Sequence, residues 1–98
     1  MPYRLSPLAE DDLDAIWLYV AEDASPARAD RLIDAIIERF DLLSEQPRMG
    51  RLRPEFGPDV RSVTVERHII YYRHEEDVLI GRVLHGRRDQ AAGWAEID

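Results

Sequence analysis

The chain has 98 residues, of which 45% are hydrophobic and 34% are charged, and its formal net charge is −7. This length supports one small hydrophobic core, so we expect a single globular domain over residues 1–98. The absence of cysteine excludes a disulfide framework and a zinc–thiolate site. There is no apolar run of about 18 residues and no basic-then-apolar leader, which predicts a cytoplasmic protein.

Charge is divided unequally along the chain. Residues 1–47 carry 4 Arg and 11 Asp or Glu, whereas residues 48–88 carry 9 Arg and 6 acidic residues. The negative total argues against a nucleic-acid binder, but the arginine-rich second half leaves contact with an anionic partner open. All 13 basic residues are arginine, so the chain has no lysine that could act as a base of lowered pKa.

The first half of the chain predicts a short strand and two helices. Residues 2–5 fit an edge strand, and the Ser-Pro pairs at 6–7 and 25–26 each match an N-cap followed by proline in the first helical turn. Apolar residues recur with helical spacing after each pair, which predicts helices over about 7–22 and 26–46. The short link between them predicts an antiparallel hairpin.

The second half predicts a loop followed by three strands. Residues 47–59 are rich in proline and glycine, which indicates a loop. A period of two then replaces the helical period and predicts strands over 60–65, 68–74 and 78–86, joined by tight turns. The expected order is β-α-α-β-β-β, an α+β fold in which a two-helix hairpin packs on one face of an antiparallel sheet.

Both faces of this sheet are expected to be apolar at the centre. Alternation separates two sets of side chains in the central strands, Ile70, Tyr72, Leu79 and Val83 from Ile69, Tyr71, Val78, Ile80 and Leu84. Two helices cover only one face, so the other face needs either the C-terminal tail, with Trp94, or a partner chain. We favour an apolar groove that receives a helix of a partner, because the tail is short cover for a whole sheet face.

Seven arginines are candidates for contact with a phosphate or a carboxylate-bearing partner. They lie in the predicted loop, in the strands and after the last strand: Arg51, Arg53, Arg61, Arg73, Arg82, Arg87 and Arg88. Arg73 and Arg82 share the parity of apolar residues in their strands, so on neighbouring strands their guanidiniums would converge at a sheet margin. Such a cluster can bind phosphate, a carboxylate or a developing oxyanion, whereas the simpler interpretation is a set of scattered surface ion pairs.

The histidines and glycines carry no cofactor signature. His68, His74 and His85 lack the spacing of metal ligands, and no glycine-rich phosphate-binding motif occurs, so we expect no metal and no cofactor. His85 ends the last predicted strand and can titrate near neutral pH, although a single histidine at a strand end is more often structural. Tyr71 and Tyr72 could stack on bases, but beside two isoleucines they fit a core better.

Four segments in this order resemble the ParE branch of the RelE/ParE toxin superfamily. They are YRLSPLAEDDLDAIWLYV at 3–20, LLSEQPRMGRLRPEF at 42–56, VRSVTVERHIIYYR at 60–73 and IGRVLHGRRD at 80–89. The resemblance covers nearly the whole chain and implies a bacterial type II toxin with a two-helix hairpin on an antiparallel sheet. It also implies a ParD-like antitoxin whose helical segment lies in an apolar groove. The groove residues that we expect are Ile70, Tyr72, Leu79, Val83 and Trp94.

The superfamily implies two competing activities. ParE-like members inhibit DNA gyrase, whereas RelE-like members cleave mRNA in the ribosomal A site with the help of lysine, arginine and often a C-terminal tyrosine. This chain has no lysine, its last tyrosine is Tyr72, and its net charge of −7 opposes binding to RNA phosphate. We therefore expect a gyrase inhibitor without catalytic residues, whose seven arginines contact proteins. The alternatives are an endoribonuclease with Arg82 and His85 as the fallback catalytic pair, and a toxin that has lost activity and only binds its antitoxin.

Overall fold

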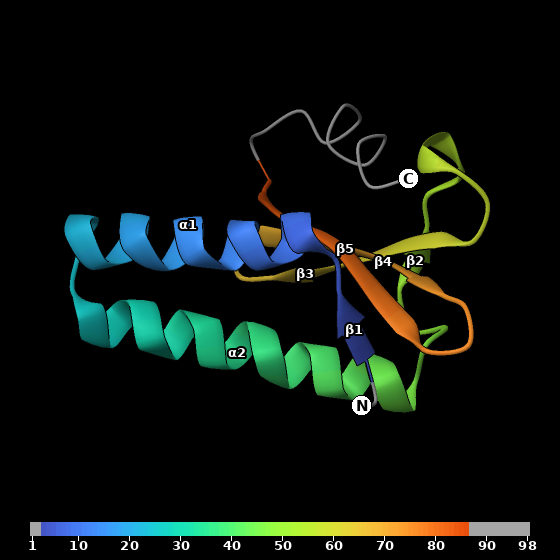
Figure 1. Ribbon diagram of the computed structural model, residues 1–98, viewed down its shortest axis with the longest axis horizontal. Coiled ribbons are helices and arrows are strands. Elements are labelled where there is room, and N and C mark those ends of the chain that lie inside the picture. Colours follow the sequence, from blue (N-terminus) through green and yellow to red (C-terminus); the bar gives the residue numbers. More distant parts are fainter. Residues whose placement is uncertain (1–2, 87–98) are drawn as a thin grey trace.

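A computed structural model describes residues 3–86, and Figure 1 shows its elements. In chain order they are β1 (Tyr3–Leu5), α1 (Pro7–Asp23), α2 (Pro26–Glu45), β2 (Arg51–Leu52), the 3₁₀ helix η1 (Pro54–Phe56), β3 (Val60–Val65), β4 (His68–His74) and β5 (Val78–His85). The helices form the expected antiparallel hairpin, and the α+β fold class is confirmed. No helix within the described residues has the length and apolar character needed to span a membrane.

Serine side chains begin both helices. Ser6 Oγ accepts a hydrogen bond from Ala9 N at 3.0 Å, and Ser25 Oγ accepts one from Arg28 N at 3.1 Å. Proline follows each cap, where its missing N–H leaves no helical hydrogen bond unmade. The buried Ser6 hydroxyl also donates to Gly81 O at 2.6 Å, so this cap fixes the start of α1 against β5.

The sheet has five strands in the order β1-β5-β4-β3-β2 and is mixed rather than wholly antiparallel. Strands β3, β4 and β5 form the expected meander, but β1 pairs with β5 in parallel. The expected loop over residues 47–59 also contains β2, which pairs with β3, and the short helix η1. Neither was predicted, because two or three residues between prolines and glycines are too few to show a period.

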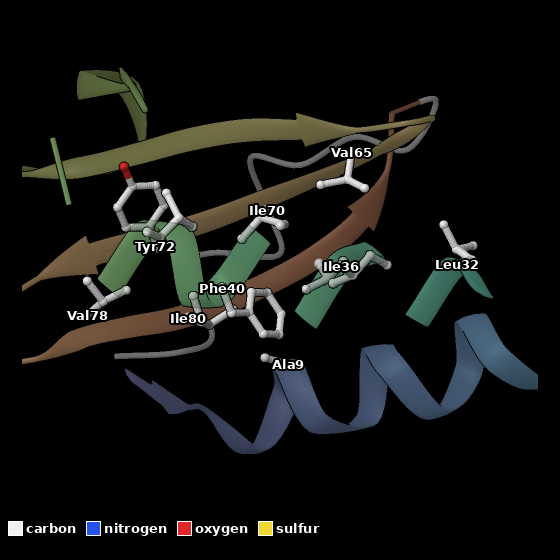
Figure 2. Packing of buried hydrophobic residues seen from close by; sticks show 11 residues of the cluster. Ala9, Leu32, Ile36, Phe40, Val65, Ile70, Tyr72, Val78 and Ile80 are labelled. Carbon is white, nitrogen blue, oxygen red and sulfur yellow. The ribbon is translucent and has the colours of Figure 1, made fainter. Parts of the chain in front are cut away.

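The main core lies between the helix hairpin and the sheet, as Figure 2 shows. Helix α2 contributes a stripe of buried residues, Ala29, Leu32, Ile36, Phe40 and Leu43. The sheet contributes Val65, Ile70, Tyr72, Val78, Ile80 and Val83. In α1, which is described along its whole length, only Ala9 is fully buried, whereas Leu13, Ile16 and Val20 pack against the core and are partly exposed.

A β-bulge in β5 changes which side chains point toward the helices. Tyr71 pairs with Arg82, but the next residue of β4, Tyr72, pairs with Ile80, so Gly81 is an extra residue in β5. After this extra residue the alternation of β5 resumes out of step. For the side chains of β5 on one side of the bulge, simple alternation along the sequence therefore predicts the wrong face of the sheet.

Because of the bulge and the helix packing, most residues of the predicted groove lie in the core instead. Ile70, Tyr72 and Val83 are at most 1% exposed and belong to the core beneath the helices. Leu79, whose neighbours in β5 are core residues, points to the opposite face and is half-buried. The expectation of an open groove is therefore wrong for Ile70, Tyr72 and Val83, and Trp94 lies outside the described residues.

The sheet face opposite the helices is partly covered by the proline-rich loop. A second apolar cluster on this face contains Val60, Tyr71 and Leu84, with Phe56 and Ile69 packed against it. Phe56 belongs to η1, and its ring meets the ring of Tyr71 edge-on with centroids 5.2 Å apart. Part of the cover that we expected from the C-terminal tail or a partner thus comes from this loop.

Candidate functional site

A cleft of about 960 Å³ lies between α1, the β3–β4 turn and the end of β5. Its apolar lining comes from Ala15, Ile16, Val20, Val83 and Leu84. Its polar and charged lining comes from Asp12, Tyr19, Asp23, Arg28, Glu66, Arg67, His68 and His85. A lining that combines apolar and charged side chains is compatible with a surface that binds proteins.

Asp12 and Arg82 form a bidentate ion pair at one side of this cleft. Arg82 Nε donates to Asp12 Oδ2 at 2.8 Å, and Arg82 Nη2 donates to Asp12 Oδ1 at 2.9 Å. The backbone N–H of Val83 also donates to Asp12 Oδ2 at 2.9 Å. The carboxylate of Asp12 therefore joins α1 to the part of β5 that lies beyond its pairing with β1. No sequence motif predicted this role for Asp12.

Two histidines face each other across β4 and β5 in the same cleft. His68 is in register with His85, and their rings are T-shaped with centroids 5.4 Å apart. Burial lowers the pKa of His68, and the neighbouring charge of His85 lowers it further, whereas Glu66 opposes the shift. Within residues 3–86, no group of three or more histidine, aspartate or glutamate side chains is arranged to hold a metal ion.

Arg53 fastens the loop to the sheet rather than extending into solvent. Its guanidinium carbon lies 4.9 Å from the centroid of Phe56 and 5.5 Å from that of Tyr71. Arg53 Nε donates to Glu55 at 3.0 Å, and Nη1 donates to the Ser62 hydroxyl at 3.2 Å. A cation held over two aromatic rings and by two polar partners stabilises the fold of η1 on the outer sheet face.

The other arginines of the sheet do not form one cluster. Arg61 Nη1 donates to Gly50 O at 2.8 Å, and Arg73 Nε lies 3.7 Å from Glu75 Oε2. Arg82 is held by the carboxylate of α1 described above. The expected convergence of Arg73 and Arg82 at a sheet margin is therefore wrong, because each guanidinium has its own carboxylate partner.

Arg51 differs from the other candidate arginines in its exposure. It lies on the edge strand β2 and is exposed, whereas Arg53, Arg61, Arg73 and Arg82 are partly buried. Arg87 and Arg88 lie outside the described residues. Among the candidates within residues 3–86, Arg51 is therefore the residue most exposed to a partner.

Exposed apolar side chains on the helix hairpin were missed by the sequence analysis. Leu18 is 54% exposed, Tyr19 is 70% exposed and Ile37 is 37% exposed. These residues lie outside the apolar stripes that face the sheet. The available signal was an excess of large apolar residues on helix faces that are otherwise acidic.

Known proteins are similar to this chain in both sequence and fold. A family model described as "ParE toxin of type II toxin-antitoxin system, parDE" matches residues 3–90. The chain belongs to the ParE toxin family. The family that we expected from the four sequence segments is thereby confirmed.

Relatives of this ParE-type toxin match it over most of their length. It is 37% identical over 82 residues to "Toxin ParE3" of Caulobacter vibrioides, covering 83% of this chain and 82% of the relative. It is 30% identical over 89 residues to "Toxin ParE1" of Mycobacterium tuberculosis, covering 89% and 91%. A solved chain of the "Chromosomal ParDE TA system from P. aeruginosa" matches with a TM-score of 0.75 at 26% identity, covering 87% of this chain and 95% of that chain.

Proposed function

We propose that this ParE-type toxin inhibits DNA gyrase by binding to it, and that a ParD-like antitoxin neutralises the toxin. The observation that carries the proposal is the family match over residues 3–90, which includes every element of the fold. Inhibition of this kind needs a protein-binding surface and no catalytic centre. A gyrase target also implies that the toxin acts in the bacterial cytoplasm.

The distribution of charge supports a protein target over RNA. With a net charge of −7 and 11 acidic residues in positions 1–47, the toxin would be repelled by RNA phosphate. An exposed guanidinium such as that of Arg51 can instead pair with carboxylates on a protein surface. We therefore propose that gyrase binds the side of the toxin that carries the exposed Arg51 on β2.

The geometry gives little support to Arg82 and His85 as a ribonuclease pair. Arg82 is bound to Asp12 by two hydrogen bonds, so its guanidinium would have to leave this partner before it could stabilise a phosphate. The ring of His85 lies against the ring of His68. Arg82 is thus held by an ion pair within the fold, and His85 faces a second histidine, which favours binding over RNA cleavage.

The exposed apolar side of the helix hairpin is the surface that we propose for the antitoxin. Tyr19 of α1 is 70% exposed and lines the cleft beside α1, together with the apolar side chains of Ile16 and Val20. An amphipathic helix can cover such a surface with residues spaced one turn apart. This position replaces the sheet groove that was expected from alternation.

Supercoiling of relaxed plasmid by purified gyrase tests the proposed target. We expect the free toxin to inhibit supercoiling and an equimolar amount of antitoxin to restore it. Relaxation of supercoiled plasmid by a type I topoisomerase is the control, and it should be unaffected. Unchanged gyrase activity at a large molar excess of toxin would contradict the proposal.

Induction of the toxin in growing cells separates the two alternatives. We expect growth arrest without new cuts in mRNA, as followed by plating and by primer extension. Cuts at A-site codons that disappear in an Arg82→Ala variant would instead support an endoribonuclease. Normal growth, together with retained antitoxin binding, would support a toxin that has lost its activity.

A further inference from the structure

His68 and His85 meet at the end of the β4–β5 pair, inside the cleft beside α1. The antiparallel register sets them directly opposite each other, and their rings stand at 83° with centroids 5.4 Å apart. The two residues are distant in sequence, so no spacing typical of metal ligands could reveal them. Only the pairing of the strands brings the two imidazoles together.

One nitrogen of this pair is buried without a hydrogen-bond partner. Nδ1 of His68 is shielded from solvent and accepts or donates no hydrogen bond within the described part of the chain. Buried polar atoms of folded proteins are nearly always paired, so an exception calls for an explanation such as an absent ligand. A neutral imidazole carries a nitrogen lone pair, which is the form in which histidine binds metal ions.

We propose that His68 and His85 together bind one Zn²⁺, Ni²⁺ or Cu²⁺ ion, each residue through one ring nitrogen. Neutral imidazole is a preferred ligand of these ions. With metal–nitrogen bonds of about 2.1 Å, two imidazoles on one tetrahedral ion have ring centres roughly 5 Å apart. The observed separation of 5.4 Å meets this requirement, and rotation about the Cβ–Cγ bond, which is soft in histidine, orients the nitrogens.

The cleft supplies the rest of the environment of the ion. It opens to solvent, so water completes the coordination of the ion. The carboxylates of Asp23 and Glu66 in its lining attract the positive ion, whereas the guanidiniums of Arg28 and Arg67 repel it. Asp12 already holds an ion pair and is not needed as a ligand. Two protein ligands bind a metal more weakly than the four of a structural zinc site, so we expect an affinity in the micromolar range.

Calorimetric titration of the full-length chain, without a histidine tag, with NiCl₂ and with ZnCl₂ tests the site. We expect one ion per chain and a Tm that rises with metal concentration, because an ion that bridges β4 and β5 binds only the folded state. His68→Gln and His85→Gln should each weaken the affinity by about tenfold or more, since one ligand remains. His74→Gln is the matched control, because His74 is exposed at the other end of β4, and it should bind as the wild type does.

Controls separate loss of the site from loss of the fold. Circular dichroism of each variant reports folding, and if His68→Gln does not fold, His85→Gln decides the question. MgCl₂ should produce no binding, because Mg²⁺ prefers oxygen ligands. No heat and no change in Tm at millimolar Zn²⁺ and Ni²⁺ would overturn the proposal, and so would an equal loss of affinity in His74→Gln and His85→Gln.

Discussion

Asp12 shows how one side chain connects elements that are distant in sequence. Its carboxylate accepts hydrogen bonds from Arg82 Nε, Arg82 Nη2 and Val83 N at 2.8–2.9 Å. The Asp12 side chain is 12% exposed and that of Arg82 is 14% exposed, so water screens the pair little. This contact holds α1 on the part of β5 that β1 does not reach.

Replacing Asp12 with asparagine should therefore destabilise the protein. Asp12→Asn keeps the size of the side chain but removes its charge, and we expect the free energy of unfolding to fall by about 2–3 kcal/mol in urea titrations. Asp14→Asn is the matched control on an exposed position of the same helix, and its effect should stay within about 0.5 kcal/mol. Equal effects of the two substitutions would show that the ion pair contributes nothing specific.

The titration of His68 should make the protein less stable as the pH falls. Burial and His85 lower its folded-state pKa below the ordinary value of 6.5, so the unfolded chain binds a proton first as the pH falls. The stabilisation is fully present above pH 6.5 and is lost between that value and the lowered pKa. We expect urea unfolding at several pH values to show this loss in the wild type and a weaker loss in His68→Gln. Identical profiles would rule out this residue as the cause.

At the scale of elements, the proline-rich loop is anchored to the sheet by Tyr72. Its hydroxyl accepts a hydrogen bond from Gly50 N at 2.9 Å and donates one to Pro47 O at 2.8 Å. A Cβ atom on Gly50 would lie 2.5 Å from this hydroxyl, so glycine is needed for the close approach. The loop between α2 and β3 is thus a fixed element, which carries Arg51 and covers the outer sheet face with η1.

Tyr72→Phe should loosen this loop without disturbing the core that the ring fills. The backbone N–H of Gly50 is left without its partner, and we expect a loss of about 1–3 kcal/mol in unfolding free energy. Faster amide hydrogen exchange at Gly50 would locate the change. Tyr19→Phe, at a residue that is 70% exposed, removes the same hydroxyl and should have an effect near zero.

At the scale of the whole molecule, the helix hairpin is acidic, and the loop and sheet carry most of the arginines. Most of the described loop and sheet arginines have partners within the fold, whereas Arg51 stands exposed on β2. An exposed charge at the rim of an interface mainly affects the rate of association and its dependence on salt. If gyrase binds this side, the inhibition should depend on Arg51.

Arg51→Glu should weaken the inhibition of gyrase supercoiling by about tenfold, as measured by the toxin concentration for half-inhibition. Arg31→Glu makes the same change in net charge on an exposed position of α2, and it should leave the inhibition nearly unchanged. If both variants lose inhibition equally, the effect belongs to total charge, and the β2 side is not the contact surface.

The sequence by itself determined the features that depend on neighbouring residues. The Ser-Pro caps located the helix starts, helical spacing gave α1 and α2, and a period of two gave β3, β4 and β5 within one residue. The resemblance over residues 3–89 also identified the family. Each of these signals is local or is carried by a run of residues, so it can be read along the chain.

Only the tertiary structure decided the features that depend on register and packing between distant segments. The bulge at Gly81 exchanged the faces of Val83 and Leu84, and β1 joined β5 in parallel. The same register placed His68 opposite His85, and helix packing brought Asp12 to Arg82. Alternation cannot reveal an extra residue in a strand, because the bulge is defined by its partner strand and not by its own sequence.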